Sequence, residues 1–210
     1  MKNIMVDLET FGTNPFSMIL SIGAVYFDPT KVGDAAIKSS FYVTIDPIAS
    51  GKAGFMTDMS TICWWLDPAR RPAWDDFLSV AHFEPADALQ GFSLWIGGLF
   101  DLSQDPTAHD DLDFPKDPAK RETFEPASQI AMWGNGPAFD NEILRNAYTR
   151  MNMDAPWKHF GDRCFRTMKN LGGARNLAPP HEGHIHNALV DARQQAKWLC
   201  NIINTLHVTV

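Results

Sequence analysis

Two acidic residues near the N-terminus, Asp7 and Glu9, have a spacing that suits the binding of divalent metal ions. They end a short apolar run that reads as a buried strand. Side chains two residues apart in a strand lie on one face, with Cα atoms about 6.5 Å apart. Two carboxylates at this spacing can reach a pair of cations about 3.5–4 Å apart. Chance alone gives an Asp-x-Glu about 0.5 times in this composition, so a solvated strand end is an equal alternative.

Two further polar motifs follow later in the chain. Asp140 comes five residues after Asn135, just past an apolar run and at the start of a helical pattern. Taken alone, an acid there favours a simpler role, stabilising the helix dipole by about 0.3–1 kcal/mol. His186 and Asp191 form a His-x4-Asp pair. Residues five apart in one helix are rotated by about 140°, so these two converge only if His186 precedes or begins the helix.

The three motifs stand in one order, Asp7-Leu8-Glu9-Thr10, then residues 135–140, then residues 186–191. In this order they resemble the motifs of the DEDDh 3′–5′ exonucleases, the DnaQ-like group. A histidine with four intervening residues, rather than a tyrosine with three, is typical of the DEDDh branch. The similarity is closest to the phage and prophage exonuclease VIII-like and small exoribonuclease-like branch. It is carried by residues 63–66 (CWWL), 133–136 (WGNG), 162–167 (DRCFRT) and 186–189 (HNAL).

The resemblance implies a metal-dependent hydrolysis of phosphodiester bonds from the 3′ end of single-stranded or 3′-overhang DNA or RNA, by a two-metal mechanism that releases nucleoside monophosphates. The implied ligands of two Mg²⁺ or Mn²⁺ ions are Asp7, Glu9, Asp140 and Asp191. The implied general base is His186, and the ordinary histidine pKa of about 6.5 suits that role. The candidate substrate-binding residues are Leu8, Thr10, Trp64, Asn135 and Phe139. A homodimer is also expected, whereas the choice between RNA and DNA stays open.

Two other functions remain as alternatives. A non-catalytic nucleic-acid-binding module of the same fold would not need all four carboxylates and the histidine, which are present. A zinc hydrolase could use His181, His184 and His186, which form a His-x2-His-x-His cluster. Zinc would need a third or fourth ligand, and Cys164 is the plausible distant thiol.

Aromatic and basic residues near the motifs allow two interpretations each. Trp64 and Trp65 are about 100° apart on a helix, so at most one packs squarely in the core. The other could stack on a base, or both could lie partly buried in a groove. Arg163 and Arg166 could contact a phosphate, although a surface or ion-paired position is the simpler reading.

The elements that must position these residues predict an α/β fold. Strands are expected over residues 2–10, 17–28 and 39–45, and their short connections require an antiparallel meander. A later strand covers residues 129–133. The expected helices are 57–66 (capped by Thr57 or Ser60), 85–99, 138–150, 165–171 and 187–206. These elements predict one mixed α/β sheet flanked by helices. The resemblance to the DEDDh exonucleases implies a ribonuclease-H-like mixed β-sheet, with an N-terminal antiparallel meander plus parallel strands.

Composition bounds the remaining possibilities. A chain of 210 residues with 45% apolar residues predicts one domain, or at most two small ones. With the resemblance, the expectation is a single exonuclease domain over residues 1–210. Residues 101–126 hold eight acids, three bases and four prolines, which predicts an acidic surface loop or insertion. Three cysteines predict no disulfide framework and a reducing, cytoplasmic location, and no apolar run is long enough to span a membrane.

The net charge of −7 argues against binding nucleic acid through bulk positive charge. Its distribution weakens that argument. Once the four candidate metal ligands and residues 101–126 are set aside, 15 basic and 13 acidic residues remain. The acidity therefore fits a catalyst that holds a short 3′ end through metal ions.

Overall fold

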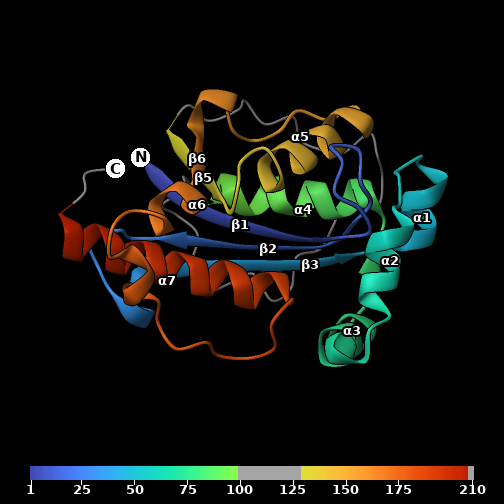
Figure 1. Ribbon diagram of the computed structural model, residues 1–210. Coiled ribbons are helices and arrows are strands. Elements are labelled where there is room, and N and C mark those ends of the chain that lie inside the picture. The colour runs from blue at the N-terminus through green and yellow to red at the C-terminus, as the bar shows by residue number, and fades with distance from the viewer. Residues whose placement is uncertain (99–128, 208–210) are drawn as a thin grey trace.

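The computed structural model describes residues 1–98 and 129–207, which form a six-stranded mixed sheet with helices on both faces (Figure 1). The strand order is β4-β3-β2-β1-β5-β6. The strands are β1 (Lys2–Thr10), β2 (Ile19–Phe27), β3 (Ile37–Ile45), β4 (His82–Phe83), β5 (Ile130–Gly134) and β6 (Asp162–Cys164). Strands β1, β2 and β3 form the predicted antiparallel meander, while β5 pairs in parallel with β1 and β6 with β5. The predicted ribonuclease-H-like mixed sheet is therefore confirmed.

Helices cover both faces of the sheet and one of its ends. The α-helices are α1 (Pro47–Lys52), α2 (Met59–Trp65), α3 (Arg71–Leu78), α4 (Pro85–Gly98), α5 (Asp140–Arg150), α6 (Phe165–Lys169) and α7 (Ala188–Leu206). Short 3₁₀ turns are η1 (Gly33–Ala36), η2 (Pro68–Arg70), η4 (His159–Gly161) and η5 (Ala174–Leu177). Helices α4 and α5 pack on one face, α6 and α7 pack on the other, and α1 to α3 gather at one end of the sheet (Figure 1).

The alternation of side chains along β1 decides which face carries the acids. Ile4, Val6 and Leu8 point into the apolar core beneath α4 and α5. Met5 points into the second core, beneath α7. Because alternate residues of a strand face opposite sides, Asp7 and Glu9 share the α7 face with Met5.

A glycine in β2 lets α7 reach those acids. Gly23 is the register partner of Asp7, and a Cβ atom there would collide with the main chain of Ala188 at the start of α7. Since only glycine lacks that atom, the first turn of α7 lies directly on the sheet beside Asp7. The close approach brings Asp191, one turn into α7, to the edge that holds the β1 acids.

Most predicted elements are found within a few residues of their expected ends. The prediction for the cap of α2 is wrong, because Asp58, rather than Thr57 or Ser60, caps it by accepting the main-chain N–H of Ser60 at 2.8 Å. Helix α3 and the short strands β4 and β6 carry too little periodicity to be predicted. The predicted acidic insertion at 101–126 lies outside the described residues. Within the part that is described, no helix is both long and apolar enough to cross a membrane.

Candidate active site

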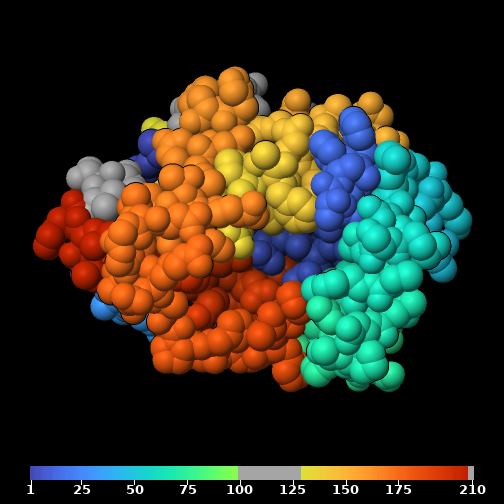
Figure 2. Space-filling model, in the orientation of Figure 1, coloured from blue at the N-terminus to red at the C-terminus, as the bar shows by residue number. Residues whose placement is uncertain are grey.

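A cleft of about 350 Å³ lies at the carboxyl ends of β1 and β5, and it contains all five predicted catalytic residues. Its lining residues are Asp7, Leu8, Glu9, Asn135, Phe139, Asp140, Arg166, His186, Asp191 and Gln195. In Figure 2 the surface is hollowed where β1, in dark blue, lies between the teal α2–α3 region and the orange segment that contains α6. Parallel strands direct their carboxyl ends to one edge of a sheet, which is why residues far apart in sequence meet here.

Asp7 is held in place by a residue of α7. Its Oδ1 accepts a hydrogen bond from Nε2 of Gln195 at 2.7 Å. The other polar atom of that amide, Oε1 of Gln195, is buried and has no hydrogen-bond partner in the described structure. Gln195 was missed from sequence, although its position four residues after Asp191 places both on one face of a helix.

Asp140 begins helix α5, as the motif predicts. Its Oδ2 accepts the main-chain N–H of Asn135 at 2.9 Å, which closes the turn after β5. The next residue, Asn141, donates from Nδ2 to the carbonyl of Met132 at 2.9 Å and to Oδ1 of Asp162 at 3.0 Å. These bonds tie the start of α5 to β5 and β6, so the direction of the Asp140 carboxylate is fixed by the sheet.

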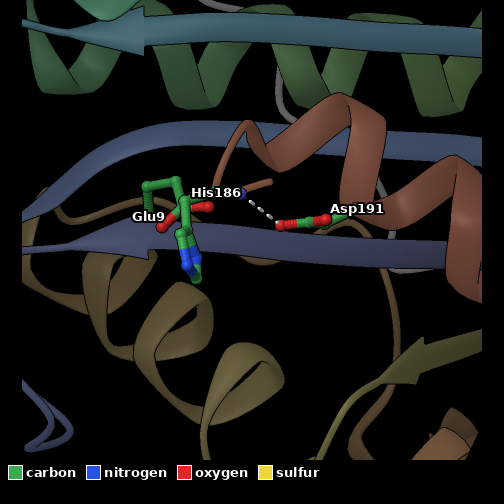
Figure 3. Close-up of side chains that lie close together, drawn as sticks. All are labelled: Glu9, His186 and Asp191. Atoms are coloured by element: carbon green, nitrogen blue, oxygen red, sulfur yellow. Dashed lines mark hydrogen bonds between the residues drawn. The ribbon is translucent and has the colours of Figure 1, made fainter. Parts of the chain in front are cut away.

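His186 precedes the last helix, which is the condition that the His-x4-Asp spacing imposed. Asn187 caps α7 with its side chain, and His186 adopts a left-handed backbone conformation with φ of 69°. The main-chain N–H of His186 donates to Oδ2 of Asp191 at 2.9 Å, the dashed line in Figure 3. The two motif residues therefore meet through a tight turn rather than along a helix face.

Glu9 completes a group of three possible ligands. One donor atom from each of Glu9, His186 and Asp191 lies within 4.8 Å of the others, and Figure 3 shows the three side chains meeting from β1 and the start of α7. Asp7 and Asp140 line the same cleft. The donor set is dominated by carboxylate oxygens, which Mg²⁺ and Mn²⁺ prefer.

Burial raises the pKa values of three acids in the cleft, and neighbouring negative charges raise two of them further. Desolvation raises the pKa of Asp7 well above its usual value, and the charges of Asp140, Glu9 and Asp191 raise it further. The pKa of Glu9 is raised well above its usual value by desolvation and by Asp191 and Asp140. Burial raises the pKa of Asp140 to about 7, against the lowering effect of its hydrogen bonds. A bound cation would relieve both the desolvation and the repulsion.

His186 has the opposite tendency. Its pKa is lowered by desolvation and by the positive charge of Arg70, although Asp191 opposes the change. The imidazole is therefore mostly neutral at pH 7 and able to accept a proton. Its ring makes a T-shaped contact with Trp64, with ring centroids 4.8 Å apart at an interplanar angle of 81°.

The two adjacent tryptophans have separate roles. Trp65 is buried in a small core and donates from Nε1 to the carbonyl of Thr10 at 3.0 Å. Trp64 is 37% exposed and lies against His186, although it is not among the residues that line the cleft. Arg70 stacks over the Trp64 ring, with Cζ 4.2 Å from the centroid.

The other predicted substrate-binding residues divide similarly. Leu8, Asn135 and Phe139 line the cleft, and Oδ1 of Asn135 is buried without a partner among the described residues. Thr10 is not among the lining residues: it is buried, and its hydroxyl donates to the carbonyl of Gly12 at 2.6 Å. Thr10 thus acts in the structure by shaping the end of β1.

The three histidines of the zinc alternative do not converge. Nε2 of His181 lies 3.3 Å from Oδ1 of Asp191, and Nδ1 of His184 lies 2.9 Å from Oδ2 of Asp76 on α3. His186 alone of the three joins the possible metal-binding group found among the described residues. This arrangement gives no support to a zinc site built from the histidine cluster.

Comparison with known proteins identifies the family. A search of curated proteins found no match. The nuclease domain of 3′hExo, a DEDDh family member solved with rAMP, has a TM-score of 0.57 at 12% identity, over 97% of this chain and 92% of that chain. E. coli Exonuclease I, solved with a dA16 oligonucleotide, has a TM-score of 0.54 at 13% identity, over 97% of this chain and 41% of that chain. The family model described as "3′-5′ exoribonuclease Rv2179c-like domain" matches residues 2–203. The chain therefore shares the fold of a DEDDh nuclease and belongs to the Rv2179c-like 3′–5′ exoribonuclease domain family.

Proposed function

We propose that this protein shortens single-stranded or 3′-overhanging nucleic acid from its 3′ end and releases nucleoside monophosphates. The family description favours RNA over DNA as the preferred substrate. The observation that carries the proposal is the meeting of four carboxylates and His186 in one open cleft. Oligonucleotides bound to Exonuclease I and rAMP bound to 3′hExo support nucleic acid as the ligand.

Asp7, Glu9, Asp140 and Asp191 would hold two Mg²⁺ or Mn²⁺ ions. The residues fit such ions, because burial raises the pKa of Asp7, Glu9 and Asp140, neighbouring carboxylates raise it further for Asp7 and Glu9, and a cation would relieve both effects. When bound, divalent ions supply activation of water and stabilisation of charge on phosphate and leaving oxygen. Gln195 fixes the orientation of Asp7 through its 2.7 Å hydrogen bond.

His186 would act as the general base by accepting a proton from water on an imidazole nitrogen. The T-shaped contact with Trp64 positions the imidazole, and its lowered pKa keeps it neutral at pH 7. Activity should therefore decline on the acid side, as His186 becomes protonated.

Apolar residues beside the acids would hold the terminal nucleoside. Leu8 and Phe139 offer apolar surface for a base, and Trp64 an exposed ring. The unpartnered Oδ1 of Asn135 offers an acceptor for a hydroxyl of the sugar.

A degradation assay tests the proposal. A 5′-fluorescent 12-mer, as RNA or DNA and single-stranded or with a 3′ overhang, is incubated with Mg²⁺, Mn²⁺ or EDTA. We expect a ladder that shortens by single nucleotides, faster on RNA, and abolished by EDTA. Binding without shortening would favour the non-catalytic alternative, and cleavage of a circular strand would indicate an endonuclease.

Oligomeric state and location are also parts of the proposal. A homodimer is proposed, and sedimentation velocity at several protein concentrations tests it by measuring the mass in solution. A cytoplasmic location fits the three cysteines, which are all free thiols. Fractionation of cells that express a tagged chain tests the location.

A further inference from the structure

Arg166 lies at the rim of the acidic cleft, on the side opposite α2 and α3. It is exposed, it belongs to α6, and it is one of the lining residues of the cleft. Gly136, in the turn after β5, has a φ of 124°, and a Cβ atom there would lie 3.1 Å from Cζ of Arg166. The absence of that side chain leaves the space in which the guanidinium group lies over the turn.

The helix that carries Arg166 is anchored in the core. Phe165 is fully buried in the core beneath α7, and Sγ of Cys164 caps the helix by accepting the main-chain N–H of Thr167 at 3.3 Å. The start of α6 is therefore fixed relative to β5 and α7. Arg166 is presented to the cleft by a held backbone, not by a free loop.

The guanidinium group of Arg166 forms no hydrogen bond or ion pair with any described residue, and the same is true of the ammonium group of Lys169 one turn later. Several other arginines of the described chain are paired. Arg145 binds Asp162 at 2.7 Å, and Arg70 binds Asp67 at 2.9 Å while stacking on Trp64. Arg70, which lies beside Trp64, is thus already paired, whereas Arg166 on α6 is not.

Arg166 also stays unpaired beside acids. Its charge is felt by Asp140, whose pKa it lowers slightly, but no carboxylate oxygen lies within ion-pair distance. Lys169 also lies near other positive charges. Its pKa is lowered first by burial and then by the charges of Arg166 and Arg175. Cationic side chains that lie close together and form no ion pair with an acidic side chain favour the binding of an anion from solution. Nucleic-acid phosphates are anions that arginine binds well.

We propose that Arg166 binds a backbone phosphate of the nucleic-acid strand next to the acidic cleft, with Lys169 extending this phosphate-binding strip along α6. The proposal rests on the proposed function, because it assumes a nucleic-acid substrate. It gives an acidic protein a local positive contact beside its acidic cleft. It also separates two roles, with the phosphate held on the α6 side and apolar base contacts near Trp64.

Binding at several salt concentrations tests the proposal. The probe is a fluorescein-labelled 8-mer RNA with phosphorothioate linkages at its 3′ end, measured by anisotropy with Mg²⁺ between 50 and 300 mM KCl. We expect Arg166→Gln to raise Kd about tenfold and to reduce the slope of log Kd against log salt by about 0.7. Arg166→Lys should restore the slope. In steady-state assays, KM should rise while kcat stays within about twofold, because the contact is made equally before and during reaction.

Arg163→Gln is the matched control. Arg163 lies three residues earlier, and its guanidinium donates to the carbonyls of Phe160 and Asp162, both at 3.0 Å. Its replacement should leave Kd and the salt slope unchanged, and thermal melting checks that all variants fold. If Arg166→Gln binds like the wild type with the same slope, or lowers kcat alone, the inference is wrong. If the wild type fails to shorten RNA, the proposed function fails, while the salt slopes still decide whether Arg166 binds phosphate.

Discussion

Replacing Asp140 by asparagine separates the cost of a buried charge from the benefit of a metal ligand. Asp140 is 3% exposed, and burial raises its pKa from 3.8 to about 7. Asparagine has the same shape, and its carbonyl oxygen can still accept the N–H of Asn135. The substitution therefore removes the charge with little change in packing.

The expected effect follows from the pKa shift. A folded-state pKa above the unfolded value contributes stability that is present below about pH 4 and is lost as the pH rises through about 7. Relative to a neutral group, the raised pKa of Asp140 costs about 4 kcal/mol of stability at pH 8, where the folded carboxyl is ionised. At pH 5 the cost is about 2 kcal/mol, because the folded carboxyl is protonated while the unfolded one would ionise. For a domain of this size, about 4 kcal/mol corresponds to a rise in Tm of about 8–16 °C at pH 8.

Thermal melting of EDTA-treated protein measures this effect. In EDTA, Asp140→Asn should melt above the wild type, with a larger difference at pH 8 than at pH 5. Added Mg²⁺ should stabilise the wild type more than the variant, because binding to the folded state adds stability. Asp154→Asn, at an exposed acid, is the control and should leave Tm within about 1 °C. An unchanged or lower Tm for metal-free Asp140→Asn at pH 8 would refute the electrostatic account of the cleft.

Three further predictions concern other parts of the molecule. His186→Ala should remove most exonuclease activity while Mg²⁺ binding, followed by calorimetry, is largely kept; full activity would rule out His186 as the base. Gly23→Ala should prevent the start of α7 from packing on β2, which circular dichroism and the yield of folded protein would report, whereas a normal Tm would contradict the close approach. Tyr148→Phe should lower the free energy of unfolding in urea by about 1–3 kcal/mol, because the buried hydroxyl donates to the carbonyl of Leu89 at 2.8 Å and the buried Ser93 hydroxyl, also 2.8 Å away, would lose its partner. An unchanged unfolding midpoint would show that the hydroxyl contributes nothing.

The ordered motifs predicted much of the site because each depends on local geometry. The period of two in β1 places Asp7 and Glu9 on one face, and the turn before α7 lets His186 meet Asp191. Such relations hold whatever the rest of the chain does, so they are readable from spacing. The antiparallel meander was predictable for a similar reason, since short connections leave no other pairing.

Residues that reach the site through packing between distant elements were harder to predict from the sequence. Gln195 reaches Asp7 only because Gly23 allows α7 to lie on β2. The spacing of four residues places Gln195 on the same helix face as Asp191, but it does not place that face against Asp7. Trp64 and Trp65 have equal claims in sequence, and the placement of α2 against the sheet buries one and exposes the other. The cap of α2 was misassigned because Thr57, Asp58 and Ser60 all suit that position.

The sequence by itself determined the acids, their order, the strand and helix periods and the general class of fold, since these depend on residue types and short spacings. Tertiary structure alone decided which polar groups stay unpaired. The pairing of Arg70 with Asp67, and the freedom of Arg166 from any such bond within the described structure, depend on distances between whole elements. Burial has the same origin, because the raised pKa of Asp140 requires water to be excluded by segments far apart in the chain. Short sequence spacings therefore predict which residues form the site, whereas the packing of distant elements determines their burial, pairing and pKa values.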